Sequence, residues 1–294
     1  MKRLLVIGCG DIARHALPLW LPHYRVAALL RSQDAQIASA GVQTFVGDLD
    51  RPESLVQLAG CADIVAHLAP PAGVGTGDQR TRNLIAALEA GAMLPRRFVY
   101  VSTSGVYGDC AGERVDESRR INPQTERARR RADAEIALSR WGEARGVEVL
   151  VLRVPGIYSA ARLPLERLRK GTPALREQDD VHTGHIHAED LAAIVTAALD
   201  RGASGPYNAC DDSEIRMGDW FDLVADRAGL PRPPRVSRAE AKQLVPPDLL
   251  SFMSESRRLV NRRIKESLGV RLRYPTVHDG VPSLRFEPRG ALAT

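Results

Sequence analysis

Apolar and polar positions follow two different patterns along the first half of the chain, and together these predict its elements. Continuous apolar runs between turn signals indicate buried strands, whereas apolar residues that recur at helical spacing indicate helices. The expected strands cover residues 4–7, 24–30, 42–46, 62–68, 97–101 and 147–154, and the expected helices cover residues 11–20, 52–59, 78–90 and 123–144. Strands that alternate with helices favour an α/β fold, a doubly wound parallel sheet with helices on both faces.

The second half of the chain is less regular. Prolines are frequent between positions 231 and 247, and charged helical segments such as residues 257–268 follow. Residues 190–199 have the pattern of an apolar helix that could return to the sheet. This half therefore predicts a smaller C-terminal lobe added to the sheet.

A glycine-rich turn joins the first expected strand to the first expected helix. Gly8, Gly10 and Ala13 form a G-x-G-x-x-A pattern, and its last two variable positions are Asp11 and Ile12. In a dinucleotide-binding turn the first glycine permits the bend, the second lets a pyrophosphate approach the backbone, and the small third residue allows close helix–strand packing. The free N–H groups of the helix N-terminus complete a phosphate site. The alternative is a tight turn that binds no ligand.

In this position the turn indicates a Rossmann-type dinucleotide-binding core. We expect residues 1–155 to form that core, with residues 186–200 returning to it. Most of residues 156–294 are then expected to form a smaller substrate lobe.

The end of the second expected strand bears on the type of cofactor. Arg31 and Ser32 stand where an NAD-specific fold usually places an acidic residue for the ribose 2′-hydroxyl. A guanidinium instead fits a 2′-phosphate through two hydrogen bonds. These residues favour NADP(H) over NAD(H), although a solvated arginine in a loop is the alternative.

Together with later segments, these residues resemble the extended short-chain dehydrogenase/reductase superfamily, in its NAD-dependent epimerase/dehydratase branch. The resemblance covers most of the chain, with motifs in the family's order. The matching segments are FVGDL at 45–49, HLA at 67–69, FVYVSTSGVYG at 98–108, RVPGIY at 153–158, HIHAEDLA at 185–192 and YN at 207–208. The resemblance implies that cofactor contacts come from Asp48, Leu49, His67, Leu68, Ala69 and Pro155.

The resemblance also implies a catalytic role for a hydroxyl group. Thr103, with Ser104 beside it, matches the Ser or Thr that polarises the substrate's carbonyl or hydroxyl in this family. The alternative is a hydroxyl that only satisfies the backbone of the loop.

Catalysis in this family further requires Tyr-x-x-x-Lys on the following helix, where the lysine lowers the pKa of the tyrosine. Two landmarks, Pro123 and Glu135, place this pair at positions 127 and 131, and both positions hold arginine. Arginine cannot replace tyrosine as an acid at neutral pH. Arg131 could still supply the positive charge near the cofactor ribose, and Arg127 could bind an anionic substrate, although a solvated helix face is the alternative. The chain thus resembles an atypical member of the superfamily that lacks the dyad.

Another group would then have to transfer the proton. The candidates near matched motifs are Tyr107, Tyr158, His182, His185 and His187, and the two tyrosines are also candidate substrate contacts. A lone histidine beside a strand end is more often packed or solvated. His185 and His187 share a strand face and could ligate a metal, but no acidic or cysteine partner lies nearby in the sequence. We therefore expect no metal.

Composition and charge exclude several function classes. Lys and Arg number 41 against 36 Asp and Glu, and a net charge of +5 does not indicate a nucleic-acid binder. Aromatic residues make up only 5%, which argues against a base-stacking surface. No apolar run is long enough to span a membrane. The four cysteines are far apart, as expected of thiols in a reducing cytoplasm.

Two functions remain open. The first is an NADP(H)-binding oxidoreductase or epimerase/dehydratase-like enzyme that acts on a small polar substrate with a non-standard proton donor. The second is a catalytically inactive NADP(H)-binding regulator or sensor. Thr103 and the full substrate lobe favour the enzyme. The resemblance also implies a possible homodimer through a two-helix face.

Overall fold

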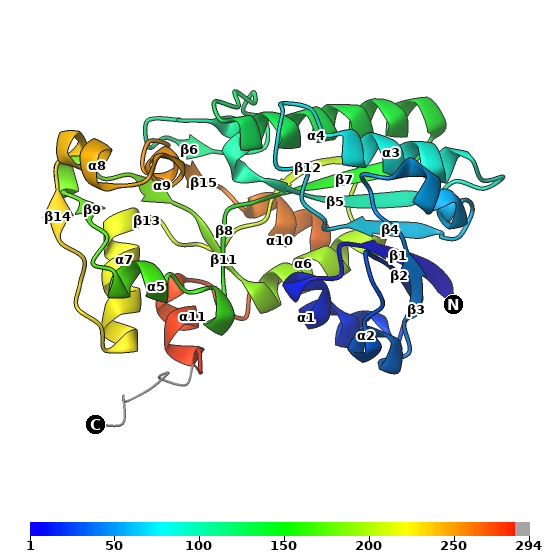
Figure 1. Cartoon of the computed structure of the whole chain (residues 1–294), viewed down its shortest axis with the longest axis horizontal. Coiled ribbons are helices and arrows are strands. Elements are labelled where there is room, and N and C mark those ends of the chain that lie inside the picture. Colours follow the sequence, from blue (N-terminus) through cyan, green and yellow to red (C-terminus); the bar gives the residue numbers. More distant parts are fainter. Residues whose placement is uncertain (286–294) are drawn as a thin grey trace.

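A seven-stranded parallel sheet forms the centre of the computed structural model, which describes residues 1–285 apart from the side chain of Asp248 (Figure 1). Its strands are β1 (Lys2–Ile7), β2 (Tyr24–Leu30), β3 (Gln43–Val46), β4 (Ile64–His67), β5 (Arg97–Thr103), β7 (Glu148–Val154) and β12 (Gly205–Asn208). They are arranged in the order β12-β7-β5-β4-β1-β2-β3, and every neighbouring pair is parallel. The strand order reverses between β1 and β4, where open α/β sheets bind their ligands.

Helices cover both faces of this sheet. The long helices α3 (Gln79–Glu89) and α4 (Glu126–Arg145) lie above it in Figure 1, and α1 (Asp11–Trp20), α2 (Ala35–Ser39) and α6 (Ala188–Asp200) lie below it. Successive side chains of a strand point to opposite faces. In β1, Leu4 and Val6 pack into the apolar cluster with α1 and α6, whereas Leu5 and Ile7 pack into the cluster with α3 and α4. The expected Rossmann-type α/β fold is confirmed.

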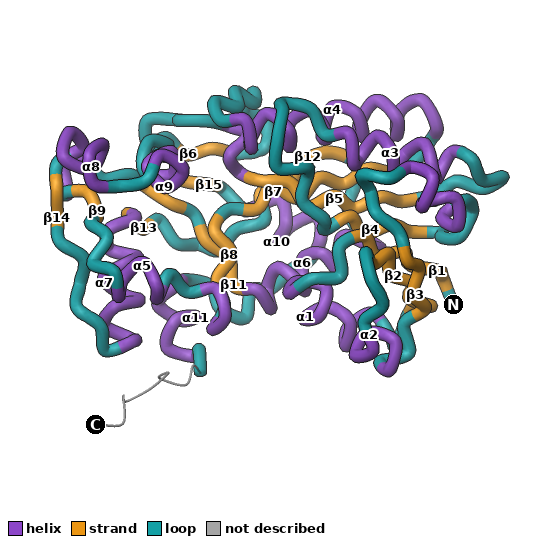
Figure 2. Tube along the Cα trace, in the orientation of Figure 1, coloured by secondary structure: helices purple, strands orange, loops and turns teal. Residues whose placement is uncertain are grey.

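The C-terminal part combines short strands and helices, joined by long loops (Figure 2). The strand pairs are β8 (Gly156–Tyr158) with β11 (His185–His187), β9 (Ala174–Leu175) with β14 (Arg235–Val236), and β10 (His182–Thr183) with β13 (Ile215–Arg216). The helices include α5 (Leu165–Arg169), α7 (Met217–Ala228), α8 (Arg238–Leu244), α9 (Pro247–Phe252) and α11 (Val277–Ser283). A separate apolar cluster around Tyr158, Trp220 and Phe221 holds several of them together.

Two segments of the second half bear on the expected organisation. The helix expected over residues 257–268 is wrong in its first part, because Arg258–Leu259 forms β15 and pairs with β6 (Arg114–Val115). Only α10 (Arg262–Leu268) is helical there. Helix α6 packs against α1 on one face of the sheet. The boundary expected between residues 155 and 156, which would separate the core from the substrate lobe, stays a prediction.

Candidate functional site

The turn between β1 and α1 contains two glycines with different physical roles. Gly8 has a φ of +88°, and a Cβ atom there would lie 2.5 Å from the backbone N of Ala69. The fold itself therefore requires glycine at position 8. Gly10 caps α1 in an extended conformation, and a Cβ atom there would meet nothing within 4 Å. This open space beside a helix N-terminus fits the approach of a phosphate group.

The ends of β1 and β4 are joined at this turn. The backbone N–H groups of Leu68 and Ala69 both donate to the carbonyl oxygen of Ile7, at 2.7 and 3.0 Å. Ala13 is completely buried and Ile12 nearly so, and both belong to the apolar cluster below the sheet. Ile12 can therefore take part in phosphate binding only through its backbone.

Arg31 and Ser32 are exposed just beyond the end of β2. The backbone N–H of Gly47 donates to the carbonyl oxygen of Leu30, which brings the loop that holds Asp48 beside them. The Asp48 carboxylate accepts a hydrogen bond from the N–H of Asp50 at 3.0 Å, and Leu49 is buried. The expected adenosine-side residues are therefore close together.

An acidic residue that the sequence analysis did not single out lies near this end of β2. Asp34 caps α2 by accepting hydrogen bonds from the N–H groups of Gln36 and Ile37, and its second oxygen lies 2.6 Å from Nη2 of Arg14. The Ile37 hydrogen bond is the main cause of the lowered pKa of Asp34. Its carboxylate is thus already engaged, while Arg31 is exposed nearby.

Arg131 spans the carboxyl ends of β4 and β5. Its Nη1 donates to the carbonyl oxygen of Val101 at 2.7 Å and to the hydroxyl of Tyr100 at 3.0 Å, and it lies 3.5 Å from the carbonyl oxygen of Ala69. Helix α4 presents it there, after a start capped by the side chain of Thr125. The expected ribose-side cation therefore lies between the ends of β4 and β5, one strand away from the switch point between β1 and β4.

Thr103 is the last residue of β5 and is half-buried. Its hydroxyl accepts a hydrogen bond from the N–H of Gly105 at 3.2 Å, so the loop does use this side chain, and Ser104 beside it is buried. Thr103 lies in register with Val154, and Pro155 follows directly. Thr103 and Pro155 therefore end neighbouring strands at the same edge of the sheet.

The side chain of His67 lies inside the protein. Its Nε2 is 3.1 Å from the hydroxyl of Thr81 on α3, and its ring packs against Phe98 and Tyr100. Burial lowers its pKa to about 3, so the imidazole is neutral. Only its backbone is available at the strand end.

The two expected substrate tyrosines are also buried. The Tyr107 hydroxyl donates to Asn208 at 2.8 Å and accepts from Arg153 at 3.0 Å, and burial raises its pKa to about 12. Tyr158 is packed against Gly280, and burial likewise raises its pKa. In this structure, neither phenol opens into a cleft or is suited to proton exchange at neutral pH.

Arg127 occupies the position at which the family has tyrosine. Its guanidinium carbon lies 4.0 Å from the ring centre of Phe252 on α9, a cation–π contact between the core and the C-terminal part. No tyrosine occurs in α4. Phe252 carried no signal in the sequence, because it lies far along the chain from this helix.

The histidines of the second half are not among the residues at the carboxyl ends of the sheet strands. His185 and His187 are buried in β11, and burial lowers the pKa of His185 to about 3. Across residues 1–285, no group of three His, Cys, Asp or Glu residues could hold a metal ion. In the same range no helix is long and apolar enough to cross a bilayer.

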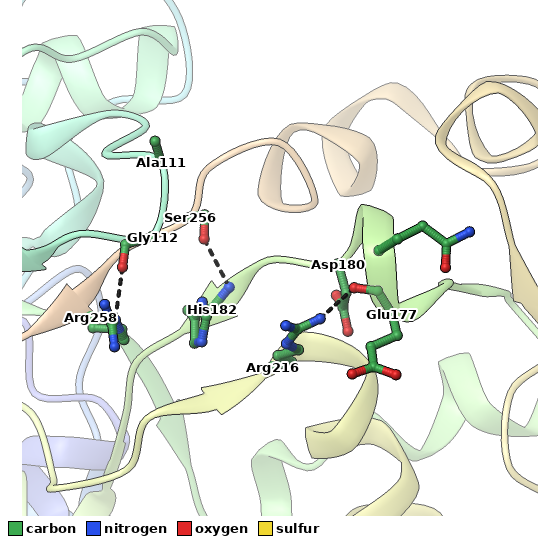
Figure 3. A pocket seen from close by; sticks show the side chains of 9 residues that line it. Ala111, Gly112, Glu177, Asp180, His182, Arg216, Ser256 and Arg258 are labelled. Atoms are coloured by element: carbon green, nitrogen blue, oxygen red, sulfur yellow. Dashed lines mark hydrogen bonds between the residues drawn. The ribbon is translucent and has the colours of Figure 1, made fainter.

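His182 lines a cavity of about 600 Å³ (Figure 3). The lining residues are Ala111, Gly112, Glu177, Gln178, Asp180, His182, Arg216, Ser256 and Arg258. Many of their polar groups already have partners: Arg258 donates to the carbonyl oxygen of Gly112, and Arg216 to that of Glu177. Burial and the two nearby arginines lower the pKa of His182. None of the strand-end residues described above lines this cavity.

Three contacts at the strand ends were missed by the sequence analysis. They are Arg14 with Asp34, Tyr100 with Arg131, and Arg162 with Asp11, at 2.6 Å between Nε and Oδ2. Arg14 follows Ala13 directly, so its position beside the turn could have been noticed. Arg162 is 151 positions from Asp11, and no local pattern connects the two.

Comparison with known proteins places the chain in a family. A family model described as NAD(P)H-binding matches residues 8–202. A trifunctional UDP-glucose 4,6-dehydratase/UDP-4-keto-6-deoxy-D-glucose 3,5-epimerase/UDP-4-keto-L-rhamnose-reductase of Arabidopsis thaliana is 24% identical over an alignment of 255 residues, and the match covers 74% of this chain and 38% of that protein. The chain therefore spans well under half the length of this curated relative.

Solved structures resemble the chain over nearly its whole length. A functionally unknown conserved protein from Silicibacter pomeroyi is 29% identical with a TM-score of 0.78, covering 97% of this chain and 98% of that one. The UDP-glucose 4-epimerase of Thermus thermophilus, in complex with NAD, has a TM-score of 0.75 at 23% identity, covering 95% and 96%. This chain belongs to the NAD(P)H-binding family, within the extended short-chain dehydrogenase/reductase superfamily of NAD-dependent epimerases and dehydratases.

Proposed function

We propose that this chain is an NADP(H)-dependent oxidoreductase or epimerase/dehydratase-like enzyme that acts on a small polar substrate with a non-standard proton donor. The observation that carries the proposal is the turn from Gly8 to Ala13 at the switch point, with open space beside Gly10. A fixed Gly8 would suit a purely structural turn as well, whereas the open space beside Gly10, at the N-terminus of α1, leaves room for a phosphate.

The residues at the strand ends suit the parts of a nicotinamide dinucleotide. In this proposal the N-terminus of α1 binds the pyrophosphate, and Arg31 with Ser32 binds the 2′-phosphate. Asp48 and Leu49 border the adenosine, and Leu68, Ala69 and Pro155 line the path toward the nicotinamide. Asp34 is already held by Arg14 and by α2, which supports the preference for a phosphorylated ribose. When bound, the cofactor supplies the hydride chemistry.

Two further side chains would act at the reacting end. Thr103 is proposed to donate a hydrogen bond to the substrate oxygen, with Ser104 beside it. Arg131 is proposed to hold the nicotinamide ribose from the position between β4 and β5. Because a guanidinium stays protonated, Arg131 can orient groups but cannot exchange a proton. The proton donor must therefore be another group.

The decisive first experiment is a fluorescence titration of the purified chain with NADPH and with NADH. We expect micromolar binding of NADPH and weaker binding of NADH. If NADPH binds, a panel of carbonyl compounds and nucleotide sugars is then tested for cofactor oxidation or reduction. If neither cofactor binds, the turn is only structural and the proposal is wrong.

A second function has support from one specific contact. Arg127 stands in place of the tyrosine and stacks on Phe252, so this position is used to connect two parts of the protein. An NADP(H)-binding sensor without catalysis would retain the turn and lose the acid/base group. This function would be supported by tight NADPH binding, no turnover on the panel, and a protein partner whose binding depends on NADPH.

The assembly is also a proposal. Helices α3 and α4 pack side by side on one face of the sheet, and the family resemblance implies that such a two-helix face can form a homodimer. Light scattering coupled to size-exclusion chromatography tests this: a dimer mass supports the proposal, and a monomer mass at high concentration contradicts it.

A further inference from the structure

Arg162 reaches from the C-terminal part of the chain to the N-terminus of α1. It ends the short helical turn η3 (Ala160–Arg162), which follows β8, and its Nε lies 2.6 Å from Oδ2 of Asp11. Asp11 is the first residue of α1, next to Gly10. A side chain from the second half therefore stands beside the proposed phosphate site.

The charge of Asp11 makes this position unusual. A carboxylate at a helix N-terminus is stabilised by the free N–H groups there, but so is a phosphate, and both would occupy the same region. Two like charges at short range disfavour each other unless a cation lies nearby. Arg162 supplies that cation, since its guanidinium is in direct contact with Asp11. Another basic group nearby is His15, whose Nε2 lies 3.5 Å from Oδ1 of Asp11 and which is charged only when protonated.

The guanidinium of Arg162 has donors to spare. Its contact with Asp11 uses Nε, and within residues 1–285 neither Nη1 nor Nη2 has a hydrogen-bond partner. The side chain is 41% exposed, so a ligand can reach it from solvent. Two N–H groups of one guanidinium match two oxygens of a phosphate.

We infer that Arg162 binds the pyrophosphate of the cofactor, together with the N-terminus of α1. This inference rests on the proposed NADP(H) binding and adds a residue to it. Because Arg162 comes from the loop after β8, the pyrophosphate would link that loop to the core. Arg162 would contribute affinity without selectivity, since NADPH and NADH carry the same pyrophosphate.

The test compares the wild type with three variants, measuring the affinity of each for NADPH and for NADH by fluorescence titration and calorimetry. In Arg162→Met, both affinities are expected to fall by about tenfold while their ratio stays unchanged. In Arg162→Lys, which retains the charge but not the paired donors, the loss is expected to be smaller. The matched control is Arg169→Met, which removes an exposed arginine from the same part of the chain and should bind like the wild type. Thermal unfolding without cofactor checks that each variant folds.

A second background separates direct contact from simple neutralisation. In Asp11→Asn the carboxylate charge is gone, so a residue that only neutralised it would no longer matter. We expect Arg162→Met to weaken both cofactors by a similar factor in this background too. If Arg162→Met causes no loss of affinity in either background, or causes a loss only when Asp11 is present, the inference is wrong. The proposed function is still upheld in that case, provided that the wild type binds NADPH. If the wild type binds neither cofactor, both are wrong.

Discussion

Arg31 is the single side chain on which the expected cofactor preference depends. It is exposed at the end of β2, and its neighbour Asp34 is held by Arg14 and by the first turn of α2. A carboxylate engaged in this way has little left to offer a ribose hydroxyl. This engagement of Asp34 is the structural support for the proposed preference for NADP(H).

Arg31→Ala is expected to lower the affinity for NADPH by about tenfold and to leave the affinity for NADH nearly unchanged, because only NADPH carries the 2′-phosphate. The measurement is the ratio of the two dissociation constants. Arg25→Ala is the matched control, since Arg25 is an exposed arginine at the opposite end of the same strand. An unchanged ratio in Arg31→Ala would show that this arginine is only solvated.

Thr103→Val is expected to lower turnover by about 100-fold, because it removes the proposed hydrogen bond to the substrate oxygen. Stability should fall by only about 1 kcal/mol, from the lost hydrogen bond with the N–H of Gly105. Activity is measured on whichever substrate the panel identifies, and cofactor affinity serves as the control that should not change. Thr103→Ser retains the hydroxyl and should retain activity. Full activity in Thr103→Val would exclude the role.

The turn between β1 and α1 is the element in which fold and function can be separated experimentally. Gly8 and Gly10 are two residues apart in the same motif. Their surroundings differ, because a Cβ atom would collide with Ala69 at the first position and meet open space at the second. Substituting each in turn therefore tests two different properties.

Gly8→Ala is expected to destabilise the protein by about 2 kcal/mol or more, because of the positive φ and the contact with Ala69. Gly10→Ala should change the free energy of unfolding by less than about 1 kcal/mol but weaken NADPH binding strongly, since the new methyl group would occupy the approach of the pyrophosphate. Denaturant unfolding and cofactor titration measure the two effects. Unchanged binding in Gly10→Ala would mean that no phosphate comes close to this turn.

The elements also show how far local patterns extend. Six of the seven strands of the sheet and helix α4 begin and end within a few residues of their predicted positions, whereas β12 was not predicted. The error at residues 257–268 has a clear cause, because Arg258 pairs with Arg114, 144 positions earlier in the chain, and forms a strand. Charged residues at helical spacing gave no sign of that pairing.

At the scale of the whole molecule, Asp211 lies where the core meets the C-terminal part, and its carboxyl group is buried. Asp211 follows β12, and its backbone N–H donates to the carbonyl oxygen of His185 in β11 at 2.8 Å. Only 2% of Asp211 is exposed, and one of its carboxylate oxygens has no partner among residues 1–285. Burial, and to a lesser extent the charges of Asp212 and Asp190, raise its pKa to about 7.

This raised pKa predicts how stability depends on pH. Between the unfolded value of 3.8 and the folded value of about 7, the folded chain holds a proton at Asp211 that the unfolded chain has released. The stabilisation from this group is therefore complete below the lower value, and it is lost as the pH rises toward 7. His185 acts in the opposite direction at acid pH, because burial lowers its pKa to about 3.

Asp211→Asn isolates the contribution of the carboxyl group, because an amide resembles the protonated acid and does not titrate. The variant is expected to gain stability over the wild type as the pH rises from about 4 to about 7, by at most about 4 kcal/mol, and the difference should then stay constant. Urea unfolding of both proteins at about pH 5 and about pH 8 measures it. A difference that does not change with pH would mean that Asp211 is already ionised in the folded state.

The sequence by itself determined the class of fold and the place of the proposed cofactor site. Apolar runs, helical spacing and the glycine turn act over a few residues, so they can be recognised without tertiary structure. They predicted the parallel sheet, the helix that carries Arg131, and the strand ends at which Ala69, Thr103 and Pro155 lie. The absence of tyrosine from that helix was also evident from the sequence.

Only the tertiary structure decided which side chains face the site and which are buried. It turned His67 and Tyr107 into the interior, engaged Asp34 with Arg14, placed Phe252 against Arg127, and brought Arg162 to Asp11. These contacts join residues that are distant in the chain, or depend on the direction of a side chain relative to its neighbours. The physical reason is that burial and charge pairing arise from the packing of whole elements, which no short sequence pattern encodes.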